Sequence, residues 1–114
     1  TKIRGFFKGL RCDDAETKAE IGRIFKLSGE IVDPHSAIGF AAAEKYAEKG
    51  VPMIVLATAH PAKFPIPVRE ATGITPALPP VLSDLMTRRE SFTVLPNQYD
   101  SITYFIENSV KKEV

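Results

Sequence analysis

Three side chains suited to binding or catalysis follow directly after a continuously apolar stretch that ends at Ala57. They are the hydroxyl of Thr58, the imidazole of His60 and the ammonium group of Lys63. Because continuous apolar character is typical of a strand covered on both faces, residues 51–58 are predicted to form a buried strand of a parallel sheet. Ligands of open α/β sheets bind just beyond the carboxyl ends of the strands. The pattern therefore predicts a binding site where this strand ends.

Each of the three side chains has a functional and a structural interpretation. The Thr58 hydroxyl could donate a hydrogen bond to an aromatic ring nitrogen, but threonine also has a high strand propensity and often bonds to nearby backbone. His60 and Lys63 could face a phosphate or carboxylate, since Pro61 predicts a helix start with free N–H groups. Alternatively, His60 is a partly buried hydrogen-bonding group and Lys63 a solvated helix residue. Position alone favours the structural interpretation of Thr58, and the turn at Pro61 is too common among folds to decide the roles of His60 and Lys63.

A second polar cluster comprises Asp33, His35 and Ser36. Asp33 is a typical N-cap, Pro34 fits the first helical position, and Gly50 is predicted to close the helix that follows. The sequence favours a capping role for this cluster over catalysis. Three such neighbours are too close in sequence to form a triad, whose members are normally brought together by the fold.

The remaining elements are predicted to be helical, and only residues 1–12 are left open as a short strand or a loop. The first expected helix begins with a capping box at Asp13 and Glu16 and ends at Gly29. Two short helices are expected further on, one from about 65 to 71 that Gly73 ends and one at 81–86. Asn97 is expected to cap the last helix, whose final turn contains Lys111 and Lys112. The fold class is thus predicted as α/β, mostly helical with one buried strand. Since no partner strands are evident, they are expected to lie in chain absent from these 114 residues.

Bulk composition excludes several classes of partner. The chain has 114 residues, of which 44% are hydrophobic and 25% charged, with 15 basic and 14 acidic residues giving a net charge of +1. These proportions suit one globular domain. Such a balance gives no electrostatic reason to expect nucleic acid or an anionic membrane. No apolar run approaches the roughly 20 residues that a membrane-spanning helix needs.

The numbers and spacing of cysteine and histidine residues indicate the redox state of the compartment and whether a metal site is expected. Cys12 is the one cysteine, so an intramolecular disulfide and a metal site built on thiolates are both excluded. A reducing, cytoplasmic location is therefore expected. His35 and His60 are the only histidines and fit no metal-binding spacing, so no metal ligand is expected.

Three stretches, in this order, resemble the threonine synthase family. They run from Ser28 to Gly39 with Asp-Pro-His-Ser-Ala at the centre, from Ala43 to Tyr46, and from Thr58 to Phe64 as Thr-Ala-His-Pro-Ala-Lys-Phe. Leu95-Pro96 before the last predicted helix also fits the family's carboxyl terminus. The resemblance extends from about Phe6 to the end of the chain.

This resemblance implies a fold and an activity. Residues 1–114 would be a single fragment, the C-terminal part of the large domain of a fold-type II (tryptophan synthase β-like) pyridoxal-phosphate enzyme. Such lyases convert O-phospho-L-homoserine and water to L-threonine and phosphate in threonine biosynthesis, and the cofactor serves as an electron sink. Thr58 would be the hydroxyl that faces the pyridine nitrogen. The resemblance carries no definite role over to His60 or Lys63.

Two motifs of a complete site are missing. In the family, the lysine that forms the Schiff base and the glycines that hold the cofactor phosphate lie upstream, and neither motif matches this chain. No catalytic residue is therefore expected here, and the fragment alone is predicted to be inactive and unable to hold the cofactor well. Helices without their partners would expose apolar faces, so self-association is expected.

Two alternatives to the synthase assignment remain. One is another pyridoxal-phosphate lyase, such as a threonine dehydratase, against which the Asp-Pro-His-Ser-Ala stretch argues. The other is a non-catalytic threonine-synthase-like protein that binds a ligand or a partner. Loss of the upstream lysine would favour that second alternative.

Overall fold

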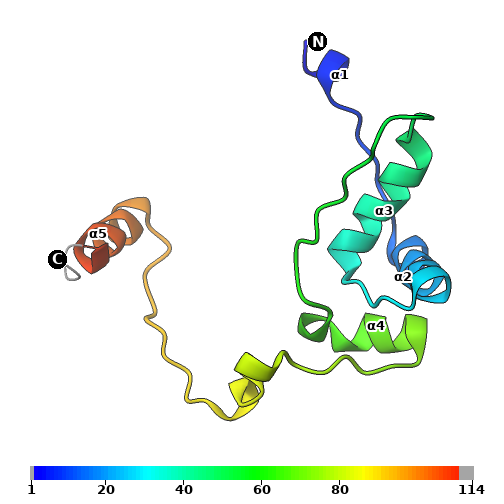
Figure 1. Ribbon diagram of the computed structural model, residues 1–114. Helices are drawn as coiled ribbons and strands as arrows, with labels where there is room; N and C mark the ends of the chain where they lie inside the picture. Colours follow the sequence, from blue (N-terminus) through cyan, green and yellow to red (C-terminus); the bar gives the residue numbers. More distant parts are fainter. Residues whose placement is uncertain (1, 111–114) are drawn as a thin grey trace. The chain divides into compact units, whose positions relative to one another are not determined.

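The computed structural model describes residues 2–110, and the chain divides into two compact units, Thr1–Val81 and Leu82–Val114. The first unit contains α1 (Ile3–Phe6), α2 (Asp14–Ser28), α3 (Pro34–Tyr46), the 3₁₀ turn η1 (Pro61–Lys63) and α4 (Pro65–Thr72), and η2 (Pro80–Leu82) lies at the boundary (Figure 1). Of residues 2–12, for which the sequence leaves a short strand or a loop open, residues 3–6 form the short helix α1 and residues 7–12 have no regular secondary structure.

Local residue chemistry sets the ends of α2. The Asp13 side chain accepts a hydrogen bond from the Glu16 N–H at 2.9 Å, while Glu16 reaches back to the Asp13 N–H at 2.8 Å. This is the predicted capping box, which satisfies two N–H groups that the helix leaves free. At the other end Gly29 has φ +77°, a left-handed conformation that glycine adopts without a Cβ clash.

The ends of α3 and α4 confirm three of the four predicted boundaries. Asp33 caps α3 with Pro34 in its first turn, and Gly73 ends α4 at φ +77°. The predicted stop at Gly50 was wrong, because α3 ends at Tyr46 and Gly50 lies in a turn beyond it, where the Val51 N–H donates to the Glu48 carbonyl.

A small core joins these elements. Its buried apolar residues are Ile21 of α2, Ala37 of α3, Ala62 of η1 and Val68 of α4, and α2 packs against both α3 and α4 (Figure 1). Gly22 permits the close approach of α4, since a Cβ there would lie 3.0 Å from the Ala71 carbonyl oxygen. The N-terminal half of α3 is thereby held against the centre of the first unit.

The predicted buried strand is absent, and this part of the fold prediction was wrong. Residues 2–110 contain no strand, and residues 51–58 run as an extended segment beside α3 (Figure 1). Ile54 is 80% exposed and Leu56 is 73% exposed, so the apolar run is not buried either. A strand is defined by ladder hydrogen bonds to a neighbour, and no described segment supplies them.

The second unit contains η3 (Leu85–Thr87) and α5 (Tyr99–Val110). The predicted short helix at 81–86 is resolved into the two 3₁₀ turns η2 and η3, while the last helix is present from Tyr99. The expected positions of Lys111 and Lys112 lie outside the described residues.

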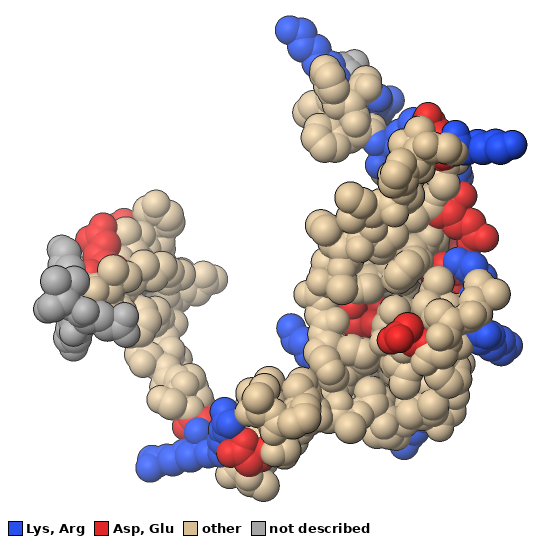
Figure 2. All heavy atoms as spheres, in the orientation of Figure 1, with Lys and Arg blue, Asp and Glu red and all other residues tan. Residues whose placement is uncertain are grey.

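The visible surface of the first unit carries both signs of charge without a patch of either one (Figure 2). Arg23 of α2 illustrates the pairing, since its guanidinium lies 2.6 Å from a Glu20 carboxylate oxygen and 3.1 Å from a Glu44 oxygen on α3. No helix among residues 2–110 is long and apolar enough to cross a membrane.

Candidate functional site

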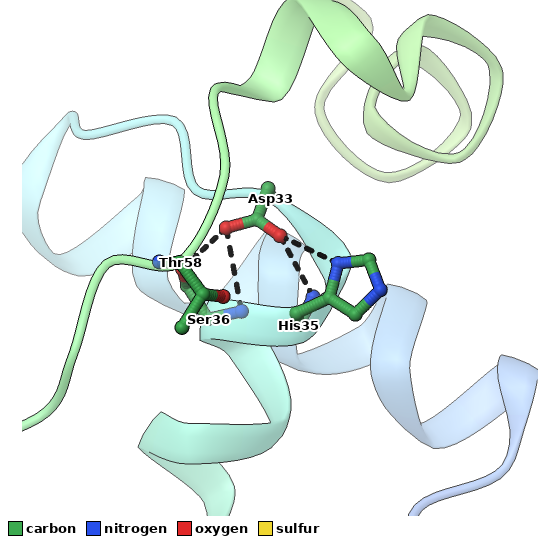
Figure 3. A network of polar contacts seen from close by, with 4 residues as sticks. All are labelled: Asp33, His35, Ser36 and Thr58. Carbon is green, nitrogen blue, oxygen red and sulfur yellow. Dashed lines mark hydrogen bonds and ion pairs between the residues drawn. The ribbon is translucent and has the colours of Figure 1, made fainter. Parts of the chain in front are cut away.

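A buried carboxylate lies at the N-terminus of α3. Asp33 is only 1% exposed, and its oxygens accept hydrogen bonds from the backbone N–H groups of His35 at 2.9 Å and Ser36 at 3.4 Å (Figure 3). These are N–H groups of the first helical turn that would otherwise have no partner. The predicted capping role of Asp33 is confirmed.

Two side chains complete the environment of this carboxylate. The Nδ1 atom of His35 lies 2.9 Å from Oδ1 of Asp33, and the Ser36 hydroxyl donates to Oδ2 (Figure 3). Because a carboxylate only accepts, Nδ1 carries the hydrogen in this contact. The His35 ring also meets Phe64 edge-on, with a centroid distance of 4.9 Å.

The Ser36 hydroxyl connects this cluster to Thr58. The Thr58 N–H donates a hydrogen bond of 3.2 Å to Ser36 Oγ, across 22 residues of sequence (Figure 3). The structure therefore unites two groups that sequence reasoning had treated separately. Apart from the shared family resemblance, no pattern in the sequence indicates that Ser36 contacts Thr58.

His60 and Lys63 do not join this network within the described residues. The His60 Nδ1 atom accepts a hydrogen bond of 3.1 Å from the Ala62 N–H and so caps η1, which is a structural role. The Lys63 ammonium lies 5.6 Å from the centre of the Phe64 ring, as in a cation–π contact. The described contacts thus explain both side chains without a bound anion.

Thr58 and His35 line one groove between α3 and the extended segment. The groove has a volume of about 520 Å³, and Gly39, Tyr46 and Val55 contribute to its wall. Thr58 is exposed, and its hydroxyl makes no hydrogen bond within the described part of the chain. A neutral hydrogen-bond donor is therefore available in the lining of an open groove.

The pKa of Asp33 is lowered from that of an ordinary aspartate. Burial alone favours the protonated acid and would raise this pKa, but hydrogen bonds from Ser36 and His35 to the ionised form outweigh the burial. The ionised carboxylate is consequently the form on which the network depends.

Comparison with known proteins assigns the chain to one family. The family model described as "Threonine synthase, C-terminal" matches residues 36–106. The chain is 44% identical to a threonine synthase of Pseudomonas aeruginosa over 108 residues, which cover 93% of this chain and 23% of that protein. It is 30% identical to the mouse protein threonine synthase-like 1 over 112 residues, covering 98% of this chain and 14% of that one.

A solved structure matches as well. The chain superposes with a TM-score of 0.75 and 46% identity on a crystal structure of pyridoxal-phosphate-bound threonine synthase from Brucella melitensis, covering 94% of this chain and 23% of that one. The chain thus spans about a quarter of the length of the threonine synthases that it matches.

Proposed function

Because this chain belongs to the threonine synthase family and matches its C-terminal part, we propose that it contributes the Thr58 hydroxyl to the pyridoxal-phosphate site of a threonine synthase. The observation that carries the proposal is the hydroxyl of the exposed Thr58, which makes no hydrogen bond within the described chain and lines a groove where the Thr58 N–H is bound to Ser36 of α3. The B. melitensis relative is described as binding this cofactor, and the 46% identity supports a shared site.

The donor chemistry at Thr58 fits a pyridine ring. A neutral hydroxyl facing the ring nitrogen leaves that nitrogen unprotonated, whereas a carboxylate partner would favour its protonation. When bound, the cofactor supplies an electron sink for carbanions during loss of phosphate from O-phospho-L-homoserine. The contribution of this chain is to hold the Thr58 donor in place.

Sequence identity is higher to a protein named threonine synthase than to one named threonine synthase-like, which supports a synthase as the function. The chain is 44% identical to the P. aeruginosa threonine synthase but 30% identical to mouse threonine synthase-like 1. The expected self-association of the isolated chain stays a proposal, supported by the exposure of Ile54 and Leu56.

The full-length protein is predicted to be active, and the isolated 114-residue chain is predicted to be inactive. We expect the full-length protein to release phosphate from O-phospho-L-homoserine, with threonine as the second product. The isolated 114-residue chain should release none, because it has no glycine-rich phosphate loop. A coupled phosphate assay with threonine analysis measures both. Turnover by the isolated chain, or an inactive full-length protein saturated with cofactor, would contradict the proposal.

A further inference from the structure

We propose that Ser36, held by Asp33, is a positioning residue that fixes Thr58 for its contact with the cofactor ring. The proposal rests on the function proposed above, in which the Thr58 hydroxyl faces the pyridine nitrogen. It adds a residue that touches neither the cofactor nor the substrate and acts only through Thr58.

The hydrogen-bonding capacity of Ser36 determines the direction of the network. A serine hydroxyl has one hydrogen to donate and two lone pairs with which to accept. The hydrogen is committed to Oδ2 of Asp33, so the oxygen is left to accept from the Thr58 N–H at 3.2 Å. Donation to an ionised group also polarises the hydroxyl and strengthens the bond that it accepts.

The carboxylate at the base of this network is itself fixed. Oδ1 of Asp33 accepts from both the backbone N–H and the Nδ1 atom of His35, each at 2.9 Å, which leaves Oδ2 facing Ser36. Asp33 is 1% exposed and Ser36 is 4% exposed, so water does not compete for these contacts. The Ser36 oxygen therefore occupies a defined position on α3.

The extended segment depends on this contact. Within the described structure, the Thr58–Ser36 bond is the one hydrogen bond between residues 48–60 and α3. The segment also approaches α3 through apolar atoms: Gly39 of α3 has no side chain, and a Cβ there would lie 3.0 Å from Cγ1 of Val55. The absence of a side chain at Gly39 allows the segment to approach α3, and the hydrogen bond to Ser36 fixes the position of Thr58 along the axis of α3.

The test uses the full-length enzyme that carries this chain. Cofactor is removed, pyridoxal phosphate is added back, and the dissociation constant and the absorption spectrum of the bound form are recorded for Ser36→Ala, Ser36→Thr and Thr58→Val. Ser28→Ala is the matched control, because the Ser28 hydroxyl also donates to an oxygen and accepts from an N–H, but at the end of α2. Ser36→Cys serves as a second variant of similar size should Ser36→Ala fail to fold, since a thiol is a weak acceptor.

We expect Ser36→Ala and Ser36→Cys to raise the cofactor dissociation constant about tenfold, the effect of losing one hydrogen bond and leaving a donor unpaired. The absorption band of the bound cofactor should shift as well. Ser36→Thr should stay within about twofold of the parent, as should Ser28→Ala. In a Thr58→Val background, Ser36→Ala should add little, because both changes remove one connected unit.

Two results would overturn the inference and can be told apart. If Thr58→Val weakens cofactor binding but both Ser36 variants bind and absorb like the parent, Ser36 does not position Thr58 and the proposed function stands. If Thr58→Val is also without effect, the assignment of Thr58 fails and the inference fails with it.

Discussion

Replacing Asp33 with alanine should lower the free energy of unfolding of this chain by about 2–4 kcal/mol, as measured by urea unfolding followed by circular dichroism. The change removes the cap of α3 and the acceptor for four hydrogen bonds at a position that is 1% exposed. The His35 and Ser36 groups would then be left without their partner. Loss of α3 would also release the extended segment, so the effect should exceed that of losing a cap alone.

Asp13→Ala is the matched control for this comparison. Asp13 caps α2 in the same way, but it is exposed and its side chain serves one backbone N–H. Its loss is expected to cost about 1 kcal/mol. Equal losses for the two variants would contradict the special role given to the Asp33 network.

The same network predicts the pH dependence of stability. The pKa of Asp33 is lower in the folded chain than in the unfolded one, so its contribution is complete above the ordinary aspartate pKa of about 3.9 and is lost as pH falls through the folded-state pKa. Asp33→Asn removes the ionised form at every pH. We therefore expect the variant to lose less stability than the parent between about pH 5 and pH 2; an unchanged acid profile would count against an ionised Asp33.

Replacing Thr58 with valine should lower kcat/KM of the full-length enzyme by roughly tenfold to a hundredfold, the effect of removing the proposed hydrogen-bond donor to the cofactor ring. Valine keeps the branched shape of threonine and removes only the hydroxyl, so packing beside Ser36 and the backbone hydrogen bond of Thr58 are retained. Steady-state phosphate release over a range of substrate concentrations measures the loss.

Thr58→Ser is the control for the hydroxyl. It keeps the donor and loses one methyl group, so we expect kcat/KM close to that of the parent. A valine variant with parental activity, or a serine variant as impaired as the valine one, would show that the hydroxyl is not the functional group.

Helix ends could be predicted from sequence because their causes are local. Asp13 with Glu16, Asp33 with Pro34, and Gly73 each act on backbone groups within one turn, so the residue types suffice. The end of α3 was misplaced because a glycine marks a possible stop and does not require one.

The conformation of residues 51–58 could not be predicted correctly from the sequence, because strand formation depends on neighbours that are distant in sequence. The apolar run at residues 51–58 has the composition of a buried strand, but burial and ladder hydrogen bonds require neighbours. The described chain provides α3 on one side and no paired strand, so Ile54 and Leu56 remain exposed.

The candidate site was only partly visible in the sequence. Family resemblance singled out Thr58, and helix capping explained Asp33. The second role of Ser36 was missed because its oxygen meets a backbone N–H that lies 22 residues away, and only the fold brings the two together. His60 and Lys63 were equally conspicuous in the sequence, and local contacts account for both.

A pyridoxal-phosphate titration of the isolated chain, with borohydride trapping and peptide mass analysis, tests whether this chain supplies only part of a cofactor site. We expect no specific lysine adduct, because the covalent attachment point and the phosphate loop are expected upstream in the full-length protein. A stoichiometric adduct on a single lysine, above all Lys63, would contradict this expectation and place a complete cofactor site within these 114 residues.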